Sequence, residues 1–312
     1  MSTPFALALH GGAGTIVRGS MDEGPYREGL LAALAAGQAV LSAGGSALDA
    51  VIEAVLSLEN CALFNAGHGA VFSADGRHQL DAGVMDGSSL TAGGVTGVRT
   101  IRNPILAALE VMRDGRSVLL AAGAAEELAR QRGLAMVDPS YFSTPARLAQ
   151  LHAVQATLGE QALLDHDAAA TAADDSGTVG AVARDRDGHL AAATSTGGMT
   201  NKMPGRVSDS SIVGAGVYAN DATCAVSTTG TGEHFIRSCA AYDVHARMHY
   251  LRQDLASAAS DSIVKSFQAI GGRGGLVAVS RDGELALPFN SPGMYRAWVR
   301  EGEAAKVAIF AA

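Results

Sequence analysis

The chain has 312 residues and is 48% hydrophobic, so it carries enough apolar surface for one large domain or two ordinary ones. Its formal net charge of -8 is not reversed by any lysine or arginine cluster, which disfavours nucleic acid and acidic membranes and favours a small-molecule or peptide ligand. Cys61, Cys224 and Cys239 form no CxxC pair, so we expect reduced core thiols rather than disulfides or a zinc site. Because the first residues also lack the pattern of a signal peptide, we expect a soluble, cytoplasmic protein.

The first half of the chain predicts strands and helices in separate blocks. An apolar run at 5–9 ends at the glycines of HGGAGT and indicates a buried strand that runs into a tight loop. Asp75-Gly76 is typical of a hairpin turn, and a second strand pair is expected within 89–100. Ser46 is a suitable N-cap for a helix. Apolar spacing and well-placed prolines predict helices over 26–42, 46–59, 103–113, 117–132 and 144–158.

The pattern dissolves between residues 159 and 177. This tract contains five acidic residues and no lysine or arginine, and its alanine run shows no apolar stripe. We expect a flexible linker there. By itself, this pattern is also typical of an ordinary solvated loop between two domains.

Hairpins joined by tight turns recur after this tract. They are expected over 178–184 with 189–195, 213–219 with 222–228, and 276–280 with 284–288. Helices are expected over 232–252 and 254–270. Antiparallel hairpins with helices grouped in blocks predict an α+β protein with sheets inside and helices outside.

Motifs for several other chemistries are missing or incomplete. The chain has no HExxH or GxSxG motif, and His245 and His249 lack a clear third metal ligand. The fragments GGMTNK and TGTGEHF have the wrong spacing for phosphate or dinucleotide loops. Hydroxyls and glycines therefore remain as the candidate chemical groups.

Thr178 is the strongest candidate among these hydroxyls. A threonine becomes a good nucleophile when a base takes its proton, and a free α-amine with a pKa of about 7.7 to 8.0 can serve as that base. Thr178 would gain such an amine if the peptide bond after Gly177 were cut. Gly177, which lacks a Cβ, can adopt the strained geometry that attack on its carbonyl requires.

Several motifs, in order, resemble the plant-type L-asparaginase and isoaspartyl aminopeptidase family of N-terminal nucleophile hydrolases. They are HGGAGT, LFNAGHGAVF, LDAGVMDG, GTVGAVA, ATSTGGMTNKMPGRVSDS, GAGVYAN, STTGTGE and ALPFNSPGMYRAW. The resemblance implies a single αββα sandwich that cuts itself into an α subunit, 1–177, and a β subunit, 178–312. It also implies hydrolysis of the side-chain amide of L-asparagine and of β-aspartyl dipeptides without a catalytic cofactor, and a dimer of αβ units.

The same resemblance implies roles for individual residues. Thr178 matches the nucleophile and Asn65 a residue beside it, while Thr196, Thr229 and Gly230 match its catalytic companions. Arg206 and Asp209 match the residues that hold the substrate's α-carboxylate and α-amine, and Gly230 and Gly232 match residues that line the pocket. A sodium ion is implied on the backbone carbonyls of Leu58, Glu59, Cys61, Phe64, Ala66 and His68, the last at a position where an aliphatic residue is expected.

Elementary chemistry agrees with the binding roles, although alternatives stay open. The guanidinium of Arg206 suits a carboxylate and Asp209 suits an ammonium, but residues at this spacing also form surface ion pairs. Thr229 and Gly230 precede an expected helix, where an oxyanion hole or a simple helix cap would fit. A glycosylasparaginase-like amidase and a processing-defective protein that only binds amino acids are the competing functions.

Overall fold

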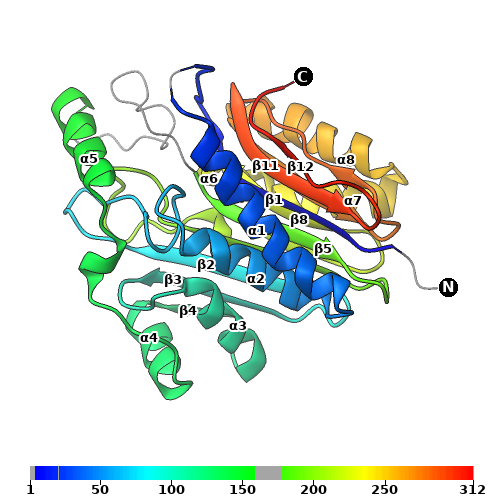
Figure 1. Ribbon diagram of the computed structural model, residues 1–312, viewed down its shortest axis with the longest axis horizontal. Helices are drawn as coiled ribbons and strands as arrows, with labels where there is room; N and C mark the ends of the chain where they lie inside the picture. Colours follow the sequence, from blue (N-terminus) through cyan, green and yellow to red (C-terminus); the bar gives the residue numbers. More distant parts are fainter. Residues whose placement is uncertain (1–3, 20, 159–176, 312) are drawn as a thin grey trace.

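The computed structural model describes residues 4–19, 21–158 and 177–311 (Figure 1). The tract expected to be a linker, 159–177, therefore lies outside the described residues except for Gly177. No helix in the described ranges is both long and apolar enough to cross a membrane.

The larger sheet has eight strands in the order β12-β11-β1-β5-β6-β2-β3-β4. Its neighbours pair antiparallel except β3 and β4, which are parallel. The strands are β1 (Ala6–Gly14), β2 (Leu80–Asp86), β3 (Ala92–Val98), β4 (Leu119–Ala121), β5 (Val179–Arg184), β6 (Leu190–Thr196), β11 (Gly293–Arg300) and β12 (Lys306–Ala308).

The smaller sheet has four antiparallel strands in the order β10-β9-β8-β7. These are β7 (Val217–Ala219), β8 (Cys224–Gly230), β9 (Gly274–Ser280) and β10 (Leu285–Ala286). The helices are α1 (Gly24–Ser42), α2 (Ala47–Glu59), α3 (Pro104–Asp114), α4 (Ala122–Gln131), α5 (Pro145–Leu158), α6 (Gly232–Ser238), α7 (Ala240–Leu251) and α8 (Leu255–Asp261).

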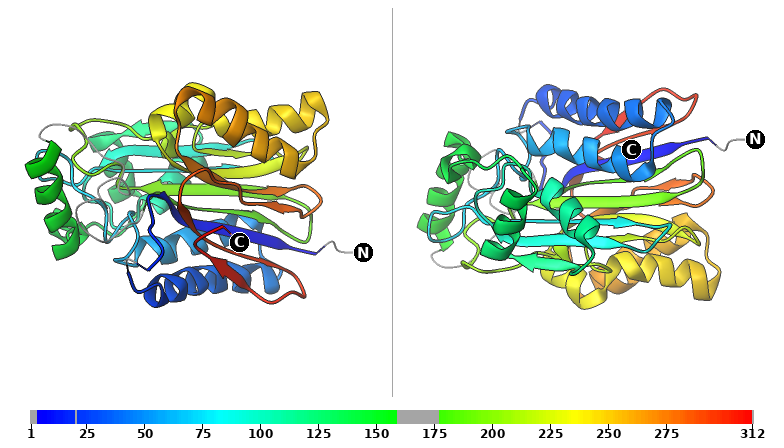
Figure 2. Two further views of the ribbon diagram at one scale, coloured as in Figure 1. Left: turned by 90° about the horizontal axis from the view of Figure 1, so that it is seen from above. Right: turned by 90° about the horizontal axis from the view of Figure 1, so that it is seen from below.

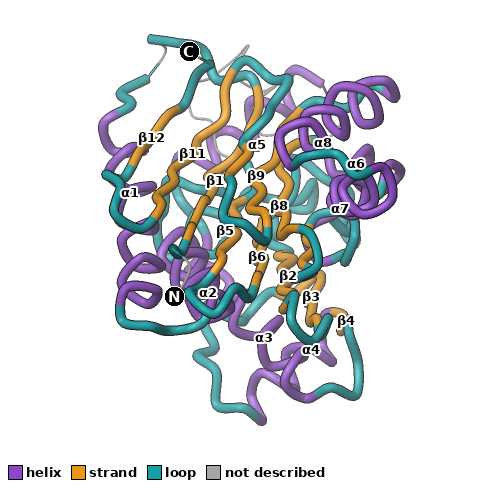
Figure 3. Tube along the Cα trace, turned by 90° about the vertical axis from the view of Figure 1, so that its right-hand side faces the viewer, coloured by secondary structure: helices purple, strands orange, loops and turns teal. Residues whose placement is uncertain are grey.

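The two sheets lie face to face between two helical layers, with α5 at one end of the molecule (Figure 2). Figure 3 shows α1 and α2 on one side of the strands and α6, α7 and α8 on the other. Three buried apolar clusters join the four layers, one between each adjacent pair. The fold is therefore the α+β, four-layer arrangement that the sequence predicts.

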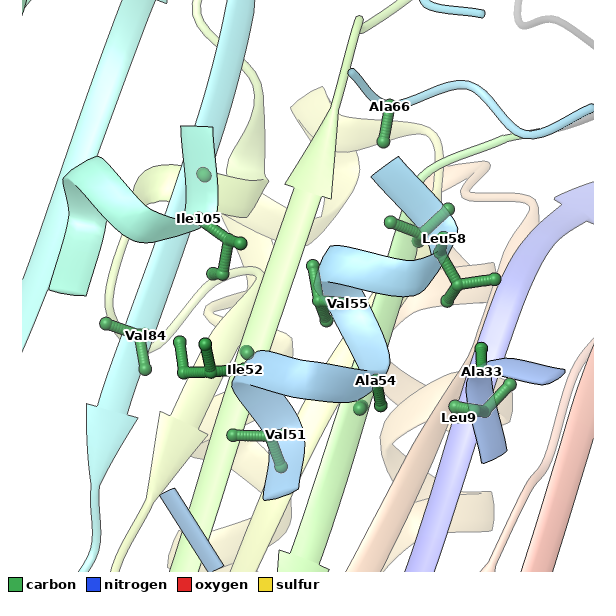
Figure 4. Close-up of a cluster of buried hydrophobic side chains, with 14 of the residues drawn as sticks. Leu9, Ala33, Val51, Ile52, Ala54, Val55, Leu58, Ala66, Val84 and Ile105 are labelled. Atoms are coloured by element: carbon green, nitrogen blue, oxygen red, sulfur yellow. The ribbon is translucent and has the colours of Figure 1, made fainter. Parts of the chain in front are cut away.

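Each interface uses side chains of a different size. Val51, Ile52 and Val55 on α2 pack over the large sheet with Ile105 of α3 (Figure 4). Between the sheets the cluster is rich in small residues, such as Ala8, Ala192 and Ala225, together with valines and a few larger side chains. Small side chains let two strand layers approach closely, so polar groups from both sheets can meet at one end of this seam.

Most predicted elements are confirmed with small shifts of their ends. Ser46 caps α2 as expected, accepting a hydrogen bond of 3.0 Å from the backbone nitrogen of Asp49 and donating one of 2.7 Å to its carboxylate. The hairpin of β5 and β6 is confirmed, as are the pairs of β7 with β8 and β9 with β10.

Other predictions are wrong in detail. Residues 74–76 do form a turn, but no strand lies directly before it. The predicted helix 117–132 begins with the short strand β4 instead. β1 continues through the glycines to Gly14 with a bulge between His10 and Gly12, where a loop was expected. The predicted helix 232–252 is broken at Cys239, which has a φ of 47°. The thiol of Cys239 is exposed and does not lie in the core as expected. The tail of the predicted helix 254–270 is π-helical and then 3-10 helical.

Candidate active site

Thr178 directly precedes β5 and is buried at the end of the seam between the sheets. Its side-chain oxygen donates a hydrogen bond of 3.1 Å to Thr196 Oγ1, at the end of the neighbouring strand β6. The Thr196 oxygen also accepts a hydrogen bond of 2.9 Å from the backbone nitrogen of Gly198. The register of β5 and β6, with Val179 opposite Ser195, brings the two threonines together although 18 positions separate them.

Asn65 holds the turn that follows Thr196. Its amide nitrogen donates to the carbonyl of Gly198 at 2.7 Å, and its amide oxygen accepts from the backbone nitrogen of Val71 at 3.0 Å. Asn65 thus links the loop after α2 to the loop after β6. Its bond to Gly198, whose nitrogen contacts Thr196, connects it indirectly with the nucleophile candidate, and its predicted role in the site stays a prediction.

The glycine segment of β1 connects Thr178 with Thr229. Gly12 has a φ of 122°, and a Cβ there would lie 2.7 Å from the Cα of Gly177, so only glycine fits this close approach. The next residue, Ala13, donates its backbone N–H to Thr229 Oγ1 at 3.2 Å. The candidate cleavage site and the end of β8 therefore meet across β1.

Arg206 and Asp209 both lie beside Gly232. A Cβ on Gly232 would be 2.7 Å from Arg206 Nη2 and 2.8 Å from Asp209 Oδ1. Asp209 is buried and accepts a hydrogen bond of 2.8 Å from Thr228 Oγ1. Burial raises the pKa of Asp209 to about 6, against the opposing effects of Thr228 and Arg206. Arg206 forms its ion pair with Glu233, which the sequence did not indicate.

Gly230 ends β8 opposite Gly274. Its φ is 139°, and a Cβ there would lie 2.6 Å from the Cα of Gly274. A glycine is therefore required where the chain turns from β8 towards α6.

Comparison with known proteins now adds to this geometry. A family model named Asparaginase_2, with the description Asparaginase, matches residues 3–309. The chain belongs to this asparaginase family. It is 53% identical to an isoaspartyl peptidase of Salmonella typhimurium over 97% of this chain and 98% of that protein. It is 52% identical to an isoaspartyl peptidase of Escherichia coli, over 97% and 95% of the two chains. With a mouse isoaspartyl peptidase/L-asparaginase it shares 38% identity over 96% and 89%.

His10 is a site residue of this asparaginase-family chain that sequence reasoning missed. Its Nδ1 lies 2.9 Å from the carbonyl oxygen of Thr178 and its Nε2 lies 2.8 Å from Ser227 Oγ. Burial lowers the pKa of His10 to about 3, although the bond to Thr178 opposes this. The ring is therefore neutral at pH 7 and donates from Nδ1, since a carbonyl can only accept. His10 orients the Thr178 backbone and has no lone pair directed at the Thr178 hydroxyl.

Lys202 is a second residue that was missed. It is buried and donates from Nζ to the carbonyls of Gln79 at 2.6 Å and Gly197 at 2.7 Å. Burial lowers the pKa of Lys202 to about 8, while Asp81 opposes the shift. The ammonium thus holds the turn after Thr196 at Gly197, while Asn65 holds it at Gly198. A lysine inside the small-residue run GGMTNK is the only sequence signal that could have indicated it.

The loop after α2 closes on itself. The backbone nitrogen of His68 donates to the carbonyl of Glu59 at 2.7 Å, and His68 Nδ1 lies 2.6 Å from the carbonyl of Tyr141, so the imidazole ties this loop to the segment before α5. The side chain of Glu59 is buried beneath the site, where its Oε1 accepts from Ser195 Oγ at 2.6 Å. Burial raises the pKa of Glu59 to about 7, against the effect of Ser195.

Proposed function

We propose that the chain is an autoprocessing isoaspartyl peptidase and L-asparaginase with Thr178 as its nucleophile. The observation that carries the proposal is the environment of the Thr178 hydroxyl. Among the described residues its hydrogen-bond partner is the hydroxyl of Thr196, and no carboxylate or imidazole contacts it. The described part of the uncut chain therefore places no base on this hydroxyl, and cleavage after Gly177 would supply one as the α-amine of Thr178.

In the proposed cleavage, Thr178 Oγ1 attacks the carbonyl carbon of Gly177 and the C–N bond breaks, which leaves an ester. The hydroxyl proton passes to the leaving nitrogen, which becomes the free α-amine of Thr178. Water then hydrolyses the ester, which frees the hydroxyl and leaves Gly177 with a carboxylate. The 1–177 segment becomes the α subunit and 178–312 the β subunit of one αββα domain. Gly12 supports this proposal because its lack of a side chain lets Gly177 lie against β1.

In the proposed turnover, Arg206 binds the substrate's α-carboxylate and Asp209 its α-ammonium, with Gly230 and Gly232 leaving room for the amino-acid head. The Thr178 amine takes the hydroxyl proton and the oxygen attacks the β-carbonyl. Thr229 and Gly230 stabilise the oxyanion. Ammonia or an amino acid leaves, and water releases aspartate from the acyl-enzyme without a cofactor taking part.

We further propose that the loop after α2 holds a sodium ion on the carbonyls of Leu58, Glu59, Cys61, Phe64, Ala66 and His68. Carbonyl oxygens are hard donors suited to such an ion. The bond from the His68 nitrogen to the Glu59 carbonyl folds this segment back on itself, and a carbonyl that accepts one such bond keeps a second lone pair for an ion. The ion would fix the loop that carries Asn65. We also propose a dimer of αβ units and, from the three free thiols, a cytoplasmic location.

Mass spectrometry of purified protein tests the proposal together with an assay for aspartate. Scaling the 31.6 kDa of the chain by fragment length gives products of roughly 18 and 14 kDa, the smaller one beginning with Thr178. Incubation with L-asparagine or a β-aspartyl dipeptide should release aspartate. The Thr178→Ala variant should show neither cleavage nor turnover, because one hydroxyl serves both steps. A full-length chain that persists and releases no aspartate would overturn the proposal and favour an amino-acid-binding protein.

A further inference from the structure

We infer that Glu233 is a positioning residue, which holds one edge of Arg206 so that the end of the guanidinium is presented to the substrate. This inference rests on the proposed function of Arg206. Glu233 Oε1 accepts from Arg206 Nε at 2.8 Å and Oε2 accepts from Nη2 at 3.0 Å. The carboxylate thus occupies the side edge of the planar fork in a bidentate pair.

The end edge of Arg206 lies against Gly198 and Gly232, which have no side chain to keep the guanidinium away. A Cβ on Gly198 would lie 3.2 Å from Nη1, and one on Gly232 would lie 2.7 Å from Nη2. The same Cβ on Gly232 would lie 2.8 Å from Asp209 Oδ1. Two cationic groups, Arg206 and Lys202, and one anionic group, Asp209, therefore lie against these two glycines, so both signs of charge that the head of an amino acid requires are present.

The two side chains of this ion pair differ in their exposure to solvent. The side chain of Arg206 is 14% exposed, whereas that of Glu233 is 48% exposed. Glu233 therefore covers the guanidinium from the solvent side, and the end edge points inward. Holding a long side chain in one rotamer before substrate arrives reduces the ordering cost of binding.

Substrate-binding measurements separate this role from the opposite one. If Glu233 instead occupied the place of the substrate carboxylate on Arg206, the substrate would have to displace it. Deleting the Glu233 side chain would then tighten substrate binding, and so would neutralising its charge. If Glu233 positions Arg206, its removal weakens binding in spite of the charge. The sign of the change in KM decides between the two.

The experiment compares wild-type protein with Glu233→Ala and Glu233→Gln, using L-asparagine hydrolysis and calorimetric binding of L-aspartate. We expect Glu233→Ala to raise KM and the aspartate Kd about tenfold with kcat changed less than about twofold. Glu233→Gln, which keeps one acceptor, should show a smaller rise. In an Arg206→Ala background, Glu233→Ala should add nothing further. L-Aspartic acid diamide, which lacks the α-carboxylate, should show no dependence on Glu233.

Glu127→Ala serves as a matched control, because Glu127 also pairs with an arginine but lies on α4 with its side chain 58% exposed. Cleavage at Gly177 reports that each variant is folded. An unchanged or lowered KM and Kd in Glu233→Ala overturns the inference. Binding of L-aspartate without hydrolysis by the wild type would overturn the proposed function, while the aspartate Kd would still test Glu233. Absence of aspartate binding by the wild type would overturn both.

Discussion

At the scale of single residues, three buried titratable groups have shifted pKa values: His10 and Asp209, which bond to residues of the small sheet or its neighbouring strands, and Glu59, which lies on the helix-facing side of the large sheet. His10 has a pKa lowered to about 3, whereas burial raises the pKa of Asp209 to about 6 and that of Glu59 to about 7. Because His10 stays neutral in the folded protein, only the unfolded chain binds a proton there as the pH falls from about 6.5 towards 3. The folded protein therefore loses stability over this range. The two acids act in the opposite direction, since their folded forms keep protons that the unfolded chain releases as the pH rises.

Replacement of His10 should isolate its share of this balance. The Thr178→Ala background keeps the protein as a single uncut chain. In that background we expect the free energy of unfolding to fall less between pH 6.5 and pH 4.5 when His10 is replaced by Asn. The difference in slope should approach about 1.4 kcal/mol per pH unit, because Asn can donate to the Thr178 carbonyl but does not titrate there. Urea unfolding at several pH values measures it. Parallel pH profiles for the two proteins would show that His10 is not the neutral group described.

Arg206 gives a second prediction at this scale. Arg206→Lys replaces a fork with a point charge, so the substrate carboxylate and Glu233 can no longer both be held in bidentate fashion. We expect KM for L-asparagine to rise by roughly tenfold or more while kcat changes little. Steady-state kinetics on matured protein provides the measurement. A KM equal to that of the wild type would remove Arg206 from the carboxylate site.

At the scale of elements, the bulged end of β1 has the most direct contact with the candidate cleavage site. Its Gly12 lies against Gly177, and its Ala13 contacts Thr229. A strand in the middle of a sheet is a rigid support, and the bulge between His10 and Gly12 redirects it towards the site. The candidate scissile bond is thus contacted by a strand that is more than 160 residues away in sequence.

Gly12→Ala tests this support. The added Cβ would meet the backbone of Gly177, so we expect cleavage to slow by at least about tenfold, as followed by gel electrophoresis over time. Gly19→Ala is the matched control, since Gly19 also has a positive φ of 81° but a Cβ there meets nothing within 4 Å. Equal cleavage rates in the two variants would show that the contact of Gly12 with Gly177 does not limit processing.

Local elements could be predicted from the sequence, whereas distant pairings could not. The turn Asp187-Gly188 and the alternating residues around it suffice for the hairpin of β5 and β6. β11 and β12 were missed, because β11 pairs with β1 across almost the whole chain and no turn signal links them. The helix break at Cys239 was missed for a related reason, since no Gly or Pro marks it and the backbone nitrogens that follow, of Ala241 and Tyr242, bond to the distant carbonyls of Ala215 and Gly214.

The candidate site shows the same division. Thr178, Thr196, Arg206 and Asp209 could be named because their motifs are contiguous and chemically distinctive. Glu233 and His10 could not, because a carboxylate on a short helix and a histidine in a strand have ordinary sequence surroundings. Their roles depend on which side chains the two sheets bring together, and a local pattern does not contain that information.

At the scale of the whole molecule, the proposed subunits are interlaced within one sheet. The strand order places β1 between β11 and β5, and β2 beside β6. Residues before and after position 178 therefore share three antiparallel strand interfaces. Neither fragment could complete the large sheet alone.

We accordingly expect the two fragments to co-elute in gel filtration under native conditions and to separate only in strong denaturant. Three backbone ladders and the apolar clusters around them oppose dissociation. Mass spectrometry of the eluted peak identifies the fragments, and Thr178→Ala marks the elution volume of uncut chain. Separate native peaks for the two fragments would contradict this arrangement.

Gly177 lies against β1 in the uncut chain, and its carbonyl carbon is the first acyl carbon that the Thr178 hydroxyl attacks in the proposed reaction. One hydroxyl can face only one carbonyl at a time, so the chain's own backbone and an incoming substrate would compete for a single place. The Gly177–Thr178 peptide bond would thus be the first substrate of the precursor. No free asparagine could be hydrolysed before that bond has been cut. Catalytic capacity in a preparation should therefore rise in strict proportion to the fraction of chains already cut, with no contribution from the remainder.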